Sequence, residues 1–275
     1  MKNIRVNLST VLNSILVVLC VSANCTVAAS RPNLIDNAIV NPQRLAIDIV
    51  QDKTRKPAQV LHFFGVRPGM TVVDVFAGGG YYTELLSYAV GPKGHVIAHN
   101  NKAYLTYQEK TIKKRFTANR LPNVTSVIAE ANELVLAANS ADIVFLALAY
   151  HDIYYRPKSS EWPPIDRDDF LSRIYSFLKP GGILAIIDHR AEPGSPTSTG
   201  HTLHRIDPII VIKELSNLGF KLVASADFLE NPDDDLSQHM YAQKIRGKTS
   251  RFILKFTKPL EFNKPFMPDE PWPIW

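Results

Sequence analysis

The sequence predicts an α/β fold, a doubly wound and mostly parallel sheet with helices on both faces, and three observations lead to it. Short apolar runs alternate with amphipathic stretches from Met70 onward. Each run is bounded by Gly, Pro, Asn or Asp, and a glycine-rich turn follows the first run. Continuous apolar runs are typical of parallel strands that are buried on both faces. Strand–helix alternation of this kind yields a doubly wound sheet.

The expected elements follow one another in chain order. Residues 42–64 read as helical, with a restart at Pro57 and apolar contacts from side chains such as Ile49 and Phe64. The apolar runs predict strands at 71–75, 95–98, 124–128, 143–148 and 183–188, followed by two more at 220–224 and 251–256. Helical patterns lie between them, at 83–90, at 170–178 and at 208–218, the last closed by Gly219.

The first residues have the layout of a secretory signal peptide. Lys2 and Arg5 form a positive start, an apolar run covers 11–21, and Val27-Ala28-Ala29 offers a cleavage site. The apolar run is shorter than the ~20 residues that a membrane-spanning helix needs. We therefore expect residues 1–29 to be removed, the mature protein to be periplasmic or secreted, and no stable membrane insertion after cleavage.

Composition excludes several classes of site. Cys20 and Cys25 both fall within the expected leader, so the mature chain can form neither a disulfide nor a zinc–cysteine site. Leu19 and Asn24 precede them where lipoprotein signals place a small residue, which disfavours a lipid anchor. The formal net charge of +5 falls to +3 when Lys2 and Arg5 are removed with the leader, which is too small and too scattered to indicate a nucleic-acid partner.

The most specific feature is the glycine loop that follows the first predicted strand. The strand ends in Asp74, the chain turns through Ala77, Gly78, Gly79 and Gly80, and a helix begins next. Glycine is needed where the backbone takes positive φ or closely approaches a ligand. The unpaired N–H groups of a helix start suit a carboxylate or a phosphate. The pattern favours a ligand-binding loop over a turn that is glycine-rich for packing alone.

With this loop in place, the sequence resembles the class I S-adenosylmethionine-dependent methyltransferases from about residue 66 to 259. Supporting segments are 66–70, 90–97 and 178–184. More narrowly, it is similar to a poorly characterised group of exported predicted methyltransferases. That resemblance rests on the segments Gly78–Glu84, His151–Tyr154 and Arg246–Phe252.

The resemblance implies a seven-stranded sheet in the order 3-2-1-4-5-7-6 with the last strand antiparallel. It marks residues 66–260 as a methyltransferase-like domain, and residues 30–65, with their helical pattern, form an N-terminal helical segment before it. Residues 261–275 are proline-rich and read as an extended C-terminal arm. S-adenosylmethionine would lie across the carboxyl ends of the first strands.

Carried over residue by residue, the resemblance places the cofactor on six positions. The loop residues would hold its methionine end, Asn100 would meet the ribose hydroxyls, and Glu130 would face the adenine amino group. The loop residues concerned are Asp74, Ala77, Gly78 and Gly80.

This chain departs from the family pattern twice. Phe76 stands where the family has its first loop glycine, so its ring either crowds the ligand or points into the helix layer. Asn100 replaces the usual acid and lacks the charge that strengthens a paired acceptor.

His151 and Asp152, directly after the fourth strand, are the catalytic candidates. His151 is a plausible general base for methyl transfer, oriented by Asp152 or by Tyr150 or Tyr154. The alternative is that His151 only closes the loop by hydrogen bonding.

Further histidines, His189, His201 and His204, follow the fifth strand and could converge with His151. They could bind a metal, but their spacing matches no compact motif, so we expect no metal. A polar substrate pocket is favoured, with Arg205 holding an anionic group. The acidic run 233–235 reads as a solvated turn.

The sequence therefore predicts an S-adenosylmethionine-dependent methyltransferase acting on a small molecule outside the cytoplasm. The alternative is a non-catalytic or repurposed binding protein of the same fold for a nucleoside or small metabolite. Metal-assisted hydrolysis at the histidines is a third, weaker hypothesis.

Overall fold

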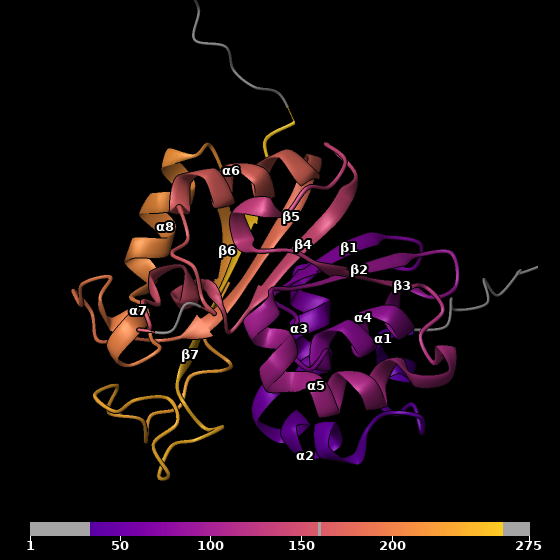
Figure 1. Cartoon of the computed structure of the whole chain (residues 1–275), viewed down its shortest axis with the longest axis horizontal. Helices are drawn as coiled ribbons and strands as arrows, with labels where there is room; N and C mark the ends of the chain where they lie inside the picture. The colour runs from indigo at the N-terminus through magenta and orange to yellow at the C-terminus, as the bar shows by residue number, and fades with distance from the viewer. Residues whose placement is uncertain (1–33, 159–160, 261–275) are drawn as a thin grey trace, which may run out of the picture. The chain divides into compact units, whose positions relative to one another are not determined.

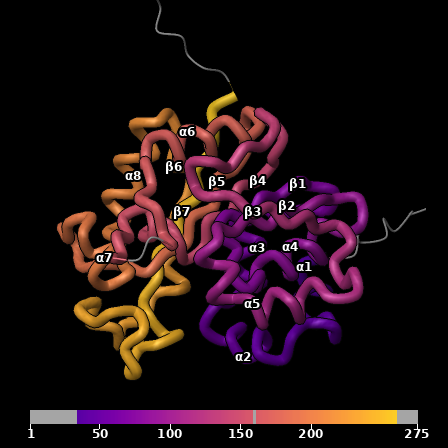
Figure 2. The backbone as a smooth tube through the Cα atoms, in the orientation of Figure 1, coloured from indigo at the N-terminus to yellow at the C-terminus, as the bar shows by residue number. Residues whose placement is uncertain are grey.

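The computed structural model describes residues 34–158 and 161–260 (Figures 1 and 2). The chain separates into two units, residues 1–32 and 33–275, and the described residues all belong to the second. The expected signal peptide at 1–29 and the expected arm at 261–275 lie outside the described residues. Within them, no helix is long and apolar enough to cross a membrane.

A seven-stranded sheet forms the centre of the domain, in the order β3-β2-β1-β4-β5-β7-β6. β1 to β5 pair in parallel, and β7 runs antiparallel to both of its neighbours, β5 and β6. Both the fold class and the strand order are confirmed. The strands are β1 Thr71–Val75, β2 His95–Asn100, β3 Val124–Ile128, β4 Ala141–Ala147, β5 Leu178–His189, β6 Lys221–Ala226 and β7 Arg251–Thr257.

Helices cover both faces of this sheet (Figure 1). One buried cluster joins α1, α3 and α4 to the sheet, and a second joins α6 and α8 to its other face. The α-helices are α1 Leu34–Ile39, α2 Ala46–Arg55, α3 Pro57–Phe64, α4 Tyr81–Val90, α5 Lys102–Phe116, α6 Arg167–Phe177, α7 Thr199–Thr202 and α8 Pro208–Asn217. Short 3₁₀ turns are η1 Thr117–Asn119, η2 Ala131–Glu133 and η3 Tyr150–Tyr154.

The restart at Pro57 separates α2 from α3, because proline lacks the N–H that would continue a helix. The expected apolar contact of Ile49 is wrong, since this side chain is 50% exposed. The residue that α2 buries is Asp48. The hydrophobic pattern misleads here because α2 docks on a buried arginine of α5 rather than on apolar side chains.

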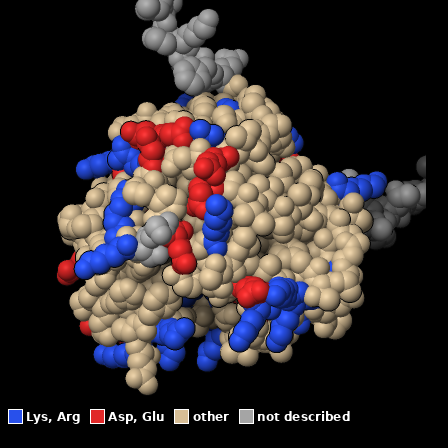
Figure 3. Space-filling model, viewed as in Figure 1, with Lys and Arg blue, Asp and Glu red and all other residues tan. Residues whose placement is uncertain are grey.

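Because β1 to β5 are parallel, their carboxyl ends meet at one edge of the sheet. The glycine loop, Asn100, Glu130 and the histidines all follow these strand ends. The face drawn in Figure 3 carries small basic and acidic groups interspersed over neutral surface. The absence of a nucleic-acid partner stays a prediction.

Candidate functional site

The glycine loop adopts the backbone that its sequence requires. Phe76, Gly78 and Gly80 all have positive φ, at 52°, 58° and 80°. The amide of Gly80 donates to the carbonyl of Ala77 (2.9 Å), and the amide of Ala77 donates to His99 (2.9 Å). The loop therefore closes as a tight turn against the end of β2.

Asn100 fastens this loop from the end of β2. Its Oδ1 accepts from the amide of Gly78 at 2.8 Å, and its Nδ2 donates to the Gly78 carbonyl at 3.0 Å. A carboxylate could not make the second bond, because it has no donor. The amide in place of the usual acid thus supports the loop backbone. Its contact with a ribose stays a prediction.

Asp74 and Glu130 occupy the expected strand ends. Asp74 is buried and accepts a hydrogen bond from Thr83 Oγ1 at 2.6 Å, so it ties β1 to the start of α4. Burial raises the pKa of Asp74 to about 7. Glu130 is half-buried, and its carboxylate accepts from the amide of Lys102 at 3.4 Å.

The ring of Phe76 points into the helix layer, which is the second of the two alternatives open from the sequence. It stacks on Tyr104 (ring centroids 5.5 Å apart) and Trp162 (5.8 Å) and packs on Phe170 of α6 (5.7 Å). A Cβ added to Gly78 would lie 3.7 Å from the Tyr104 ring. The ring of Tyr104 therefore covers the loop at Gly78.

Restoring the family glycine at Phe76 is expected to destabilise the fold. Losing a buried ring costs ~3–5 kcal/mol, whereas releasing a left-handed backbone returns only ~1–2 kcal/mol. We expect Phe76→Gly to be less stable than wild type by about 2–3 kcal/mol, yet about 1 kcal/mol more stable than Phe76→Ala, by urea denaturation.

The control for that pair is Phe170, the fourth residue of helix α6, which packs in the same cluster. There the order should reverse, with Phe170→Ala more stable than Phe170→Gly, because alanine is favoured in helices. If the alanine variant were more stable than the glycine variant at both positions, the backbone at Phe76 would not be strained.

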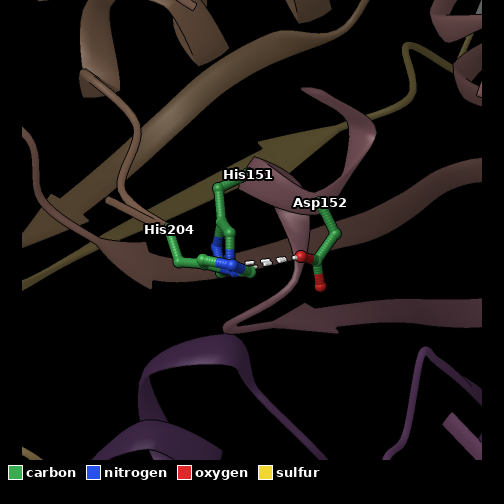
Figure 4. A group of neighbouring side chains, drawn as sticks. All are labelled: His151, Asp152 and His204. Carbon is green, nitrogen blue, oxygen red and sulfur yellow. Dashed lines mark hydrogen bonds and ion pairs between the residues drawn. The ribbon is translucent and has the colours of Figure 1, made fainter. Parts of the chain in front are cut away.

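The second part of the site is a polar centre at the end of β4 (Figure 4). The His151 ring is fully buried, and its Nδ1 lies 2.8 Å from Asp188 Oδ1. Its Nε2 lies 3.2 Å from His204 Nδ1 and 3.3 Å from Asp152 Oδ1. The other oxygen of Asp152 accepts from the Tyr104 hydroxyl at 2.6 Å.

Burial by itself would lower the pKa of His151, but the carboxylates of Asp188 and Asp152 outweigh it and raise this pKa to about 9. The role of general base that the sequence suggests for His151 stays a prediction.

These two features, a glycine loop at the end of β1 and a polar centre at the end of β4, flank the point where the strand order reverses. Residues 67–224 match the family model described as a methyltransferase domain. The chain belongs to this methyltransferase-domain family.

Curated relatives of this methyltransferase domain include the ubiquinone/menaquinone biosynthesis C-methyltransferase UbiE of Shewanella sp. (strain W3-18-1). It is 27% identical over 176 residues, which are 64% of this chain and 62% of that protein. UbiE of Ectopseudomonas mendocina is 30% identical over 133 residues, 48% of this chain and 46% of that protein. The chain thus matches less than two thirds of the length of these relatives.

Solved structures repeat the fold of the methyltransferase domain. A SAM dependent methyltransferase from Aquifex aeolicus has a TM-score of 0.52 and 25% identity, covering 76% of this chain and 98% of that one. A putative methyltransferase solved with the Haloferax volcanii Trm112 activator has a TM-score of 0.53 and 15% identity, covering 83% and 99%. The second likeness shows the fold alone.

Several side chains of the methyltransferase domain lie elsewhere than the sequence suggested. Arg205 is fully buried and forms two hydrogen bonds of 2.9 Å with Asp234, so it does not hold an anionic ligand. Asp234 is consequently buried, whereas Asp233 and Asp235 are exposed, as expected for a solvated turn. Tyr150 and Tyr154 both donate to Glu214, so Asp188 orients His151 in their place.

The histidines converge only in part. His204 and His189 both join His151, since the His189 ring centroid lies 5.7 Å from that of His151 while its Nδ1 contacts Thr249 Oγ1 at 2.6 Å. His201 instead packs on Tyr155, with ring centroids 5.7 Å apart. His239 was missed, although its ring centroid lies 4.9 Å from that of His204. No motif surrounds His239, so only the return of its long loop toward the sheet brings it here.

Arg115 was also missed, and it supports the glycine loop from below. It is fully buried near the end of α5, donates to the Gly79 carbonyl and forms ion pairs with Glu84 and with Asp48 (2.7 Å). In the sequence it follows Lys113 and Lys114 and looks like part of a solvated basic turn. Only the docking of α2 and α4 on α5 buries it.

Proposed function

We propose that this protein transfers a methyl group from S-adenosylmethionine to a small molecule outside the cytoplasm. The observation that carries the proposal is the glycine loop at the end of β1, beside β4, in the sheet of a methyltransferase domain. Gly78 and Gly80 in this loop both have positive φ. The likeness to the Aquifex aeolicus SAM dependent methyltransferase supports the choice of cofactor. Export rests on the leader-like residues 1–29.

The residues at the loop fit the cofactor on one condition. Gly78 and Gly80 carry no side chain at positive-φ positions, so the loop backbone can approach a ligand closely. The ring of Tyr104 covers Gly78, so the condition is that this ring moves aside to admit the cofactor. Asn100 and Glu130 then flank the nucleoside from the ends of β2 and β3. The bound cofactor supplies an electrophilic methyl group on its sulfonium.

The acceptor lies at the polar centre, where His151 and Asp152 orient its nucleophile against the methyl group. Asp188 fixes the His151 ring by accepting from both its Nδ1 and its backbone amide, each at 2.8 Å. Tyr104 links the two halves of the site, since it covers Gly78 and donates to Asp152.

The second candidate function is a non-catalytic binding protein of the same fold. Two observations favour it: Asn100 is already paired with the Gly78 peptide, and Tyr104 covers the loop. Such a protein would bind a nucleoside or small metabolite without turning it over.

Calorimetry with S-adenosylmethionine and S-adenosylhomocysteine on the purified protein tests the cofactor. We expect both to bind, and Gly78→Val to weaken binding by at least about tenfold, because its side chain occupies the ligand's approach. Gly69→Val is the matched control: Gly69 also has positive φ (83°) but precedes β1, at the opposite edge of the sheet. No binding of either compound at millimolar concentration would overturn the proposal.

The formation of S-adenosylhomocysteine with a panel of phenols, amines and thiols tests catalysis. His151→Ala should keep cofactor affinity within about twofold while turnover falls by about 10²-fold, the scale of a lost polar catalytic group. His201→Ala, a nearby histidine outside the polar centre, should turn over like wild type. Cofactor binding with no turnover on any acceptor would favour the second candidate function.

A further inference from the structure

We propose that His151, Asp152 and His204 bind a divalent transition-metal ion at the polar centre (Figure 4). His151 and Asp152 come from η3, and His204 comes from the loop between α7 and α8. Figure 4 shows their imidazole and carboxylate groups directed toward one another. This inference concerns binding and does not depend on methyl transfer.

The spacing of the three ligand atoms suits a single ion. His151 Nε2 lies 3.2 Å from His204 Nδ1, and Asp152 Oδ1 lies 3.3 Å and 3.6 Å from these two nitrogens. Zinc binds imidazole nitrogen and carboxylate oxygen at ~2.0–2.2 Å, so a tetrahedral site separates its ligand atoms by roughly 3.3–3.5 Å. An ion therefore fits between them with shifts of a few tenths of an ångström.

Each ligand is held by a further hydrogen bond on its other side. Asp188 accepts at His151 Nδ1, which presents Nε2 to the ion. Tyr104 donates to Asp152 Oδ2 and leaves Oδ1 facing the nitrogens. A carboxylate behind a ligating histidine is the usual support of a protein metal site.

The backbone of His204 is strained in a way that places its ring. Its φ is 52°, in the left-handed region that few non-glycine residues adopt. The surrounding chain maintains this conformation, because the Arg205 side chain is locked to Asp234 and the Ile206 amide donates to His189 (3.0 Å). Backbone strain that the surrounding structure maintains is concentrated at functional sites.

The ligand set selects the class of ion. Two imidazoles and one carboxylate suit zinc, iron or cobalt, whereas magnesium and calcium prefer oxygen ligands throughout. Three protein ligands leave at least one position open for water or substrate, as in catalytic rather than structural zinc sites. The His204 side chain is 13% exposed, so the open position can be reached from its side.

The competing explanation is that these side chains only share protons. His151 and His204 are within hydrogen-bond distance, so a proton between them would also account for the 3.2 Å separation. A metal and a shared proton require the same lone pairs, and direct titration with metal separates the two explanations.

The test uses the full chain after treatment with a chelator and dialysis, titrated with Zn²⁺ by calorimetry and with Co²⁺ by visible absorption. We expect one equivalent of each to bind, with Co²⁺ developing the absorption bands of a low-coordinate site. His204→Asn should weaken binding by at least about tenfold, since it removes the ring nitrogen. Asparagine is chosen because it tolerates positive φ.

His201→Asn is the matched control, three positions earlier in the same segment, and it should bind metal like wild type. Thermal melts of the three proteins establish that each is folded. The absence of stoichiometric binding to wild type, or equal affinity of wild type and His204→Asn, would overturn the proposal. Since no cofactor or acceptor is present, a negative result here leaves the proposed methyl transfer unaffected.

Discussion

Arg115→Met is expected to lower the free energy of unfolding by about 3–5 kcal/mol, the scale of breaking a buried ion pair by removing one partner. Arg115 pairs with Asp48 and Glu84, and all three side chains are 5% exposed or less. Methionine fills most of the volume but removes the cation that pairs with Asp48, and it leaves Glu84 with Arg120 and the Tyr88 hydroxyl. Chemical denaturation followed by circular dichroism measures the loss.

Two comparisons separate charge from packing in this result. Lys113→Met, on the same helix, removes an exposed ion pair with Glu109 and should change stability little. Adding Asp48→Asn and Glu84→Gln to Arg115→Met should recover part of the loss, because the unpaired buried charges disappear. A loss below about 1 kcal/mol in Arg115→Met would show that the network does not hold the fold.

Asp74 is expected to make the protein less stable as the pH rises from about 4 to about 7. Its pKa is raised from 3.8 to about 7 in the folded protein, so the fold favours the protonated carboxyl. The stability that this proton contributes is fully present below pH 3.8 and is lost as the pH rises through 7. A shift of about three pKa units corresponds to ~4 kcal/mol.

The measurement is the difference in unfolding free energy between wild type and Asp74→Asn across pH 4 to 8. Asparagine does not titrate, so wild type should lose up to ~4 kcal/mol relative to the variant over this range. Taking the difference cancels the contributions of other titratable groups to the pH dependence. One of these groups is His99, because burial lowers its pKa to about 4. A constant difference would mean that Asp74 stays ionised in the folded protein.

Much of the fold could be predicted from residues that follow one another in the chain. The apolar runs predicted both ends of β1 and β3 correctly, because a strand buried on both faces needs consecutive apolar side chains. The ends of the other strands were predicted within two residues, except that β5 begins five residues earlier than expected. Gly78 and Gly80 predicted a loop with positive φ, because the preference of glycine for positive φ depends on that residue alone. The strand order came from the family resemblance.

The candidate site could be predicted only as a set of positions. Parallel strands bring their carboxyl ends to one edge, so the sequence was sufficient to gather Asp74, Asn100, Glu130 and His151 there. It could not show what each side chain would pair with. Asn100 binds the Gly78 peptide and Tyr104 reaches Asp152 through packing between elements that are far apart in the chain.

The sequence by itself thus determined the α/β fold and the glycine loop, because hydrophobic periodicity and glycine φ are properties of neighbouring residues. Tertiary structure alone decided the burial of Arg115, the pairing of Arg205 with Asp234, and the meeting of His151 with His204. A charged or imidazole side chain is read as exposed from its local sequence. Its partner, which decides the free energy of burying it, comes from a distant part of the chain. The two residues are 67 positions apart in Arg115–Asp48, 53 in His151–His204 and 29 in Arg205–Asp234.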